Sequence, residues 1–219
     1  MALKYISLND ALYRYLCEAR SDSSDPILAK LRAETEALGD LSRMQISPEQ
    51  GTFLSILVAA CGARNAIEVG TFTGYSSMCI ARGLPSDGRL ICIDESREWT
   101  SLAQKYWQEA HVHEKIDLRV GSAIPILQKL DPRLVLDFAF IDAAKTEYDA
   151  YYELLLPRVR RNGLILFDNM LWEGRLVSGP IKEESGRAID VLNRKLANDA
   201  RVEAVLLPIA DGIQMCRKR

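Results

Sequence analysis

The chain has 219 residues, with 28 Lys or Arg against 30 Asp or Glu, so its formal net charge is −2. A chain of this length can bury one sizeable hydrophobic core, and we therefore expect a single domain over residues 1–219. The balanced charge lacks the basic excess that is typical of nucleic-acid-binding proteins. Because no apolar run reaches ~18 residues and no secretory leader pattern opens the sequence, we expect neither a membrane span nor export.

Five cysteines are scattered through apolar surroundings, without the C-x-x-C spacing of a metal or redox site: Cys17, Cys61, Cys79, Cys92 and Cys216. An odd number of dispersed cysteines is typical of reduced packing residues rather than of a disulfide framework. This pattern predicts a cytoplasmic protein, because thiols stay reduced in that compartment.

Two helices are predicted ahead of the first strand. Residues 8–20 place apolar side chains at helical spacing, and a second helix starts with a proline after Asp25. Because roughly 30 residues of helix cannot bury a core alone, we interpret residues 1–43 as an N-terminal helical arm of the same domain. A third, apolar helix follows Ser47, whose hydroxyl is expected to form a capping box with Gln50.

A glycine turn in AIEVGTFTGYSS, residues 66–77, is the first candidate for a binding site. An apolar strand stops at Gly70, and the chain passes through Gly74 into a helical pattern. Glycine permits a positive φ and a close ligand approach, while a helix N-terminus offers unpaired N–H groups. The next strand, GRLICIDE, ends in Asp94, where an acid can accept both hydroxyls of a ribose. The pattern predicts a nucleoside-containing cofactor.

The charge beside this turn favours one class of cofactor. The dinucleotide fingerprint G-x-G-x-x-G binds pyrophosphate, but here the spacing is E-x-G-x-x-x-G, with Glu68 ahead of the first glycine. A carboxylate there would repel pyrophosphate and favour a cation. S-adenosyl-L-methionine (SAM), with a ribose, a sulfonium and an ammonium group, fits better. Two alternatives stay open: an NAD-linked Rossmann oxidoreductase, and a non-catalytic binding module.

Strands alternating with helices predict an α/β, Rossmann-like fold with a parallel sheet. Seven apolar segments supply strands, and the D-G step at Asp211 predicts a tight hairpin that makes the last strand antiparallel. We therefore expect a seven-stranded, mostly parallel sheet with an antiparallel last strand and helices on both faces. Ligands of such sheets sit at the carboxyl ends of the strands. The candidate residues at these ends are Gly70, Asp94, Ala123, Asp142, Asp168 and Asn169.

Oxygen ligands follow two of these strands. Asp142, Asp168 and Asn169 supply two carboxylates and an amide, a donor set that suits Mg²⁺ or Mn²⁺. Lys145 comes three residues after Asp142 and is a candidate general base, because a lysine beside a divalent cation and away from water has a lowered pKa. Taken singly, each acid could equally cap a helix and the lysine could be a solvated charge. Together they predict a metal-assisted catalytic site.

Several long segments resemble the cation-dependent class I methyltransferases of the caffeoyl-CoA and catechol O-methyltransferase family, especially its bacterial members: EVGTFTGYSS, CIDESREWTSLAQKYWQEA, LDFAFIDAAKTEYDAYY, ILFDNMLWEGRL and LLPIADGIQMC. The resemblance runs from about Met44 to the C-terminus. It implies methyl transfer from SAM to one hydroxyl of a vicinal aromatic diol, and a homodimer. It implies metal ligands at Asp142, Asp168 and Asn169, a base at Lys145, and cofactor contacts at Ile46, Glu68, Gly70, Ser76, Asp94, Ala123 and Asp142.

The sequence departs from the family pattern at two positions. Glu173 stands where plant members usually have a substrate-contacting asparagine after the tryptophan of their NTLWNG motif, which predicts that anionic acyl-CoA acceptors are disfavoured. Ala144 replaces the second acid of the family's D-A-D-K motif and loosens the match at the cofactor. The acceptor is therefore left open.

Overall fold

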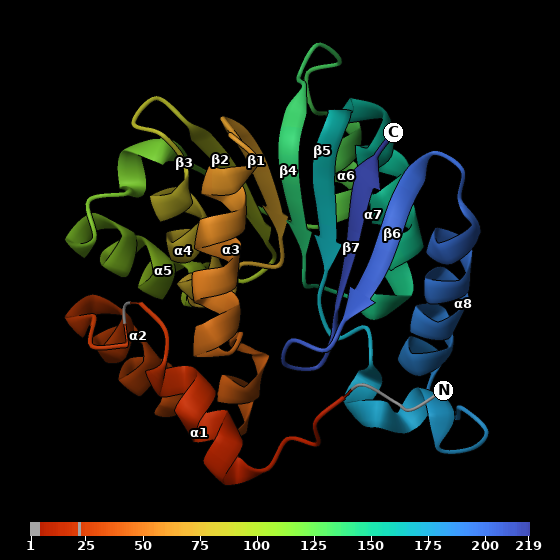
Figure 1. Cartoon of the computed structure of the whole chain (residues 1–219). Helices are drawn as coiled ribbons and strands as arrows, with labels where there is room; N and C mark the ends of the chain where they lie inside the picture. Colours follow the sequence, from red (N-terminus) through yellow and green to blue (C-terminus); the bar gives the residue numbers. More distant parts are fainter. Residues whose placement is uncertain (1–4, 22) are drawn as a thin grey trace.

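The computed structural model describes residues 5–21 and 23–219, and its centre is a seven-stranded sheet in the order β3-β2-β1-β4-β5-β7-β6 (Figure 1). Strand β7 pairs antiparallel with both β5 and β6, and the other strand pairs are parallel. The predicted fold class is confirmed. The strands are β1 Asn65–Val69, β2 Arg89–Asp94, β3 Ile116–Val120, β4 Leu136–Ile141, β5 Val159–Phe167, β6 Val202–Leu207 and β7 Ile213–Lys218.

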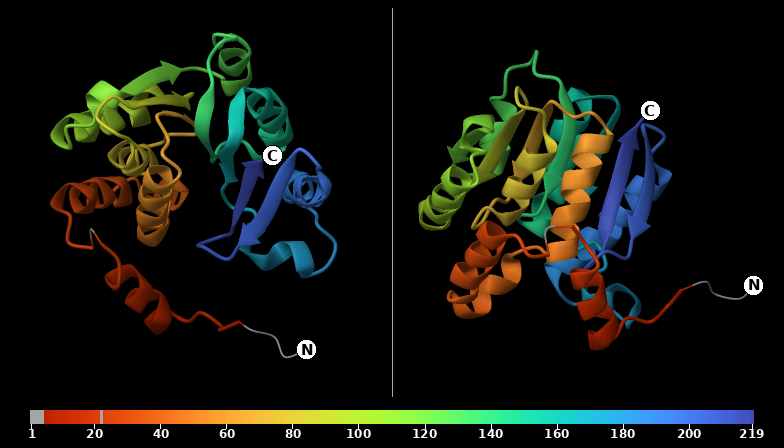
Figure 2. Two further views of the ribbon diagram at one scale, coloured as in Figure 1. Left: turned by 45° about the horizontal axis from the view of Figure 1, so that its top comes forward. Right: turned by 60° about the vertical axis from the view of Figure 1, so that its left-hand side comes forward.

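The sheet is buried on both faces because its apolar residues alternate between two cores. In β1, Ala66 faces one core, and Ile67 faces the other. The first core contains residues of α2 Pro26–Glu36, α3 Pro48–Ala60, α4 Tyr75–Gly83 and α5 Arg97–Glu109. The second contains residues of α6 Ala123–Gln128, α7 Tyr148–Leu155 and α8 Glu184–Asn198 (Figures 1 and 2).

Short 3-10 helices connect these elements: η1 Gly39–Met44, η2 His113–Lys115, η3 Lys145–Glu147, η4 Leu156–Arg158 and η5 Trp172–Val177. Within residues 5–21 and 23–219, no helix has both the length and the apolar character needed to cross a bilayer.

The two N-terminal helices differ in how they join the body. Helix α1, Asp10–Glu18, buries none of its residues and lies at the edge of the molecule (Figure 2). Its Tyr13 hydroxyl donates to Glu49 Oε2 of α3 at 3.3 Å. Helix α2 instead buries Leu28 and Leu31 in the first core. Of the predicted arm, α2 is therefore part of the core, and α1 alone is peripheral.

Two local predictions are corrected. The capping box is wrong, because the Ser47 hydroxyl donates to Glu49 Oε1 at 2.6 Å and does not cap α3. Gln50 is instead buried and lines the cavity described below. The hairpin between β6 and β7 is longer than the tight turn expected: residues 208–212 separate the strands, with the Gly212 N–H bonded to Ile209 O at 2.8 Å.

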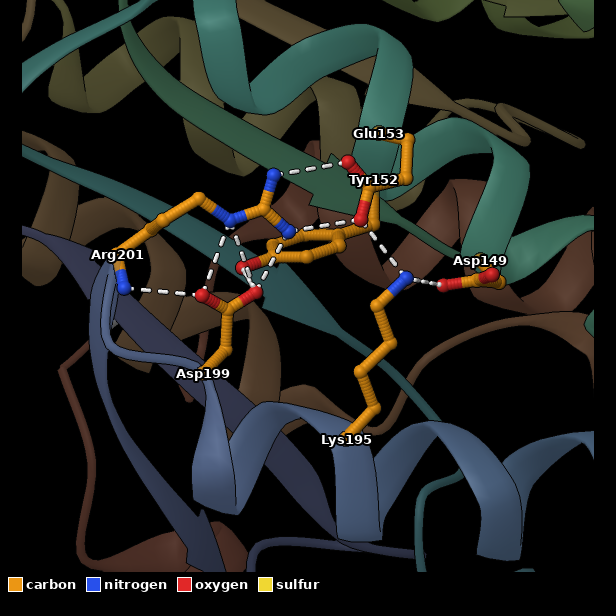
Figure 3. A network of polar contacts seen from close by, with 6 residues as sticks. All are labelled: Asp149, Tyr152, Glu153, Lys195, Asp199 and Arg201. Atoms are coloured by element: carbon orange, nitrogen blue, oxygen red, sulfur yellow. Dashed lines mark hydrogen bonds and ion pairs between the residues drawn. The ribbon is translucent and has the colours of Figure 1, made fainter.

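A polar network joins α7, α8 and the turn between α8 and β6 (Figure 3). Arg201 pairs with Glu153 and Asp199, each through Nη2. Lys195 of α8 pairs with Glu153 of α7 at 2.7 Å, and the Tyr152 hydroxyl donates to Asp199 Oδ2 at 2.9 Å. These contacts hold α8, the helix that follows η5, against α7.

Candidate active site

A cavity of about 730 Å³ opens at the carboxyl ends of the parallel strands, which point toward the lower edge of the sheet in Figure 1. Its wall is built from the glycine turn, the ends of β2, β4 and β5, η5 and the β6–β7 turn. All the site residues predicted from the sequence line this cavity except Glu68: Ile46, Gly70, Ser76, Asp94, Ala123, Asp142, Lys145, Asp168 and Asn169.

The glycine turn is held tightly against β4 and β2. Gly70 has φ +90, and a Cβ on it would lie 1.8 Å from the Asp142 carbonyl oxygen, so no other residue fits. The Asp94 carboxylate accepts the N–H groups of Thr71 at 2.9 Å and Phe72 at 2.7 Å. Asp94 therefore fixes the turn and also borders the cavity, where a ligand hydroxyl can reach its remaining lone pairs.

An aromatic pair forms part of the same wall. Phe72 follows the turn with φ +50, and its ring packs edge-to-face with Trp99 of α5, with ring centroids 5.0 Å apart. Both rings line the cavity. Edge-to-face packing leaves an apolar surface beside Asp94, which suits a flat ring next to a ribose.

Glu68 lies two residues before Gly70 and is not exposed to the cavity, and its predicted contact with the cofactor stays a prediction. The residue lies inside β1, has no exposed surface, and its Oε2 accepts the Thr71 hydroxyl at 2.9 Å. Side chains alternate along a strand, so Glu68 points with Ala66 toward α4, behind the glycine turn. Burial raises the pKa of Glu68 to about 7. Its hydrogen bond with Thr71 stabilises the glycine turn from the core side.

A Glu68→Gln variant should therefore be more heat-stable than the wild type at pH 8, with the difference shrinking toward pH 5. The folded-state pKa lies above the unfolded value, so the wild-type side chain contributes most below the unfolded pKa and loses stability as pH rises through about 7. Thermal unfolding without ligand measures this, with the exposed Glu98→Gln as control. A difference that stays constant with pH would contradict it.

Two carboxylates from neighbouring strands lie near one ammonium group, which pairs with Asp142 and not with Asp168. Asp168 is 3% exposed, and burial followed by the nearby Asp142 raises its pKa to about 7. Lys145 Nζ donates to Asp142 Oδ1 at 2.7 Å. Within the described part of the chain, no ion pair is made by Asp168. The cavity floor therefore carries an excess of negative charge away from bulk water, which attracts a cation.

The surroundings of Lys145 favour its charged ammonium form, whereas the lowered pKa was expected beside a bound divalent cation. Burial lowers the pKa of Lys145, but the Asp142 carboxylate and Tyr148 raise it more, so the net direction is upward. The Tyr148 hydroxyl accepts from Lys145 Nζ at 2.8 Å and donates to Asp168 O at 3.3 Å. Tyr148 was missed at the sequence level, although its spacing of three residues from Lys145 was a usable signal.

Gln50 is a second residue that the sequence analysis did not place at the site. It lines the cavity from α3 and is 1% exposed. Its amide lies close enough to Asp168 to lower that pKa, although Nε2 has no well-aligned hydrogen bond. A buried amide of this kind can orient a carboxylate.

The donor chemistry of Asp142, Asp168 and Asn169 fits a hard divalent cation. The three residues line one cavity, and Asn169 adopts φ +59 directly after Asp168. Residues 5–21 and 23–219 contain no cluster of three His, Cys, Asp or Glu side chains that could hold a metal, either at this site or elsewhere. The set therefore depends on an amide oxygen as its third donor, as is common for Mg²⁺ and uncommon for zinc.

The O-methyltransferase family model matches residues 18–219, which include every cavity-lining residue named above. The chain belongs to the O-methyltransferase family. This methyltransferase is thus a SAM-dependent enzyme, and the predicted family is confirmed. Family membership also decides between the alternatives left open by the glycine turn, against an NAD-linked oxidoreductase and against a non-catalytic module.

Known relatives cover most of the methyltransferase. Tricin synthase 2 of Oryza sativa subsp. japonica is 42% identical over 185 residues, which are 80% of this chain and 63% of that protein, so the chain spans less than two thirds of that relative. Caffeoyl-CoA O-methyltransferase of Eucalyptus gunnii is 37% identical over 224 residues, covering 98% of this chain and 90% of its own. The O-methyltransferase from Bacillus cereus, solved in complex with SAH, is 30% identical with a TM-score of 0.85, covering 95% and 97% of the two chains.

Helix η5 forms one wall of the methyltransferase cavity. Glu173 lines the cavity there, but its side chain is 67% exposed and pairs with Arg175, which also pairs with Glu183 at 3.1 Å. The charge of Glu173 is thus partly neutralised and screened by solvent. Its effect on acceptor choice should be smaller than the bare carboxylate suggests.

Proposed function

We propose that this O-methyltransferase requires a divalent cation and methylates one hydroxyl of a catechol-type small molecule. The observation that carries the proposal is a pair of acids beside the glycine turn, half-buried Asp142 and buried Asp168, of which Asp142 is paired with Lys145. A vicinal diol offers two adjacent oxygens that can replace waters on a cation of this type. The Eucalyptus gunnii relative, named for caffeoyl-CoA, supports a phenolic acceptor.

SAM, the donor, would supply a methyl group on a sulfonium, and the cavity offers it matched partners. Asp94 presents a carboxylate for the ribose hydroxyls beside the apolar surface of Phe72 and Trp99. The remaining proposed contacts line the cavity around the turn and at the neighbouring strand ends: Ile46, Gly70, Ser76, Ala123 and Asp142. Glu68 is the innermost proposed contact: its Oε2 accepts the Thr71 hydroxyl, and its Oε1 is buried without a hydrogen-bond partner.

Mg²⁺ or Mn²⁺ would be held by Asp142, Asp168 and Asn169, and when bound it would act as a Lewis acid that lowers the pKa of a chelating hydroxyl. Lys145 would accept the hydroxyl proton at Nζ. Its ion pair with Asp142 opposes that role, because the carboxylate favours the charged ammonium. The base role therefore requires Nζ to lose its own proton before it accepts one from the acceptor hydroxyl. A bound divalent cation that shares the negative charge of Asp142 would favour the neutral amine.

Titration calorimetry with SAH, followed by methylation of a panel of dihydroxylated aromatics with and without EDTA, tests the proposal. We expect SAH binding in both conditions, and methylated product that is lost with EDTA and restored by excess Mg²⁺. Mass spectrometry identifies the product. Turnover that chelation leaves unchanged would remove the metal, and methylation of monohydroxylated acceptors at equal rates would remove the diol requirement.

The cellular setting is part of the same proposal. We infer a single-domain, cytoplasmic enzyme that forms a homodimer and binds neither nucleic acid nor membranes. The exposed apolar side chains of the N-terminal segment, Tyr5, Ile6, Leu8 and Leu16, support self-association. Light scattering coupled to size exclusion gives the oligomeric state directly.

A Glu173→Asn variant should shift acceptor preference toward anionic catechols by about two- to fivefold in relative kcat/KM, the size expected for a screened surface charge. Asparagine is compatible with the left-handed conformation of Glu173, which has φ +53, so the fold should be kept. Glu183→Gln is the matched control, because it removes the other partner of Arg175 without lining the cavity. Unchanged relative rates across the panel would refute the shift.

A further inference from the structure

The segment from Asn169 to Gly174 carries several left-handed residues. Asn169 has φ +59, Trp172 has φ +51, Glu173 has φ +53 and Gly174 has φ +73. Glycine and asparagine tolerate this conformation, but it is unfavourable for tryptophan and glutamate. Local preference therefore does not hold the segment in place, and surrounding contacts must impose its shape.

The β6–β7 turn provides those contacts. Met170 N donates to Gly212 O at 2.9 Å and Leu171 N donates to Asp211 O at 2.8 Å, so the segment lies along the turn. Gly212 permits this approach, because a Cβ on it would lie 2.5 Å from Leu171 Cγ. The segment and the turn are therefore packed as one unit, although residues 175–207 separate them in the chain.

The Asp211 side chain completes the link at the strained position. Its Oδ1 accepts the Glu173 N–H at 2.6 Å, and the Asn169 amide also interacts with its carboxylate. Asp211, Asn169 and Glu173 all line the cavity. Asp211 thus contacts both the residue proposed as a metal ligand and the residue proposed to face the acceptor.

We infer that Asp211 is a positioning residue, which holds the left-handed segment 169–174 so that Asn169 and Glu173 face the cavity. Its role in turnover rests on the proposed function, but its role in ordering the segment does not. The carboxylate acts as a hydrogen-bond acceptor for the Glu173 N–H, and an isosteric amide oxygen can take the same place.

Hydrogen exchange with and without Asp211 tests the ordering directly. Asp211→Ala should speed exchange of amides 171–174 by about tenfold or more, since a charge-assisted bond is lost, while Asp211→Asn should stay close to wild type. Asp190→Ala removes a half-buried carboxylate of α8 that pairs with Arg194; it is the control and should change nothing in this segment. Exchange in Asp211→Ala equal to wild type, or an Asn variant as impaired as the Ala variant, would overturn the inference.

Glycine at position 173 provides the second arm of the test. Glycine tolerates the left-handed conformation, so Glu173→Gly removes the strain at this position. In this background, adding Asp211→Ala should speed the exchange of amides 171–174 by less than threefold relative to Glu173→Gly alone. This pair also serves if Asp211→Ala alone does not fold. A tenfold effect of Asp211→Ala in both backgrounds would show that the carboxylate does not act by holding the strained residue.

Kinetics then connect the segment to the reaction. Asp211→Ala should raise the KM for acceptor and the Mg²⁺ concentration for half-maximal rate by about tenfold, with SAH affinity unchanged and with rescue by Asp211→Asn. Equal loss in the Ala and Asn variants would overturn the positioning role. If the wild type methylates no diol, the proposed function fails, while the exchange measurements still decide the role of Asp211.

Discussion

Asp168→Ala should lower kcat for a catechol-type acceptor at saturating Mg²⁺ by about a thousandfold, equivalent to about 4 kcal/mol of transition-state stabilisation. Asp168 is buried at the end of β5, next to Asn169 and close to Asp142. Its removal leaves one carboxylate and one amide, and the surviving carboxylate is already paired with Lys145. Too few donors then remain to retain a divalent cation.

SAH affinity should change less than threefold in the same variant, because Asp168 lies on the β5 side of the cavity and the glycine turn is fixed by Asp94. Calorimetry with SAH and initial rates at several Mg²⁺ concentrations separate the two effects. Tyr152→Phe, which alters the network of Figure 3 away from the cavity, controls for general destabilisation. A variant that keeps wild-type turnover with EDTA present would contradict the metal role of Asp168.

The grouping of the acids at one edge of the sheet was predictable, because parallel topology alone places the carboxyl ends of the strands together. Apolar runs ending in acids gave Asp94, Asp142 and Asp168, and a sheet of parallel strands brings all such ends to one edge. No side-chain geometry was needed for that inference. The structure accordingly gathers these residues around one cavity.

The burial of Glu68 was not part of that prediction, and its contact with a cofactor stays untested. Its proximity to the glycine turn suggested contact with a cationic ligand, but side chains alternate along β1. Gly70 borders the cavity by its backbone, whereas the Glu68 side chain points toward the core under α4. The two-residue period of β1, applied to this polar residue, predicts that Glu68 lies on the same side of the sheet as Ala66.

Gln50 and Asp211 were beyond the sequence pattern for a different reason. Gln50 carried a plausible local role as part of a capping box, and the α3 start does not use it. Asp211 carried a plausible local role as a turn residue, and its contact with Glu173 joins distant segments. Local motifs account for each residue without reference to the other side of the cavity, so only tertiary packing reveals what their side chains touch.

Lys145→Ala should lower kcat by about a hundred- to ten-thousandfold, the range for loss of a general base, with acceptor KM changed by less than about threefold. Lys145 Nζ lies between Asp142 Oδ1, at 2.7 Å, and the Tyr148 hydroxyl, at 2.8 Å. These two contacts hold the amine in the cavity, on the side of the proposed metal ligands. Initial rates at saturating SAM over a range of acceptor concentrations measure both constants.

Alanine alone does not separate a base from a positive charge, because it also leaves Asp142 unpaired. Lys145→Arg is the decisive comparison, since a guanidinium keeps the ion pair and stays protonated at any accessible pH. If Lys145 accepts the hydroxyl proton, the Arg variant should be as slow as the Ala variant while binding SAH and metal like the wild type. Substantial turnover in Lys145→Arg would instead assign the residue a purely electrostatic role, and the proton would then have to leave by a route that does not pass through Nζ.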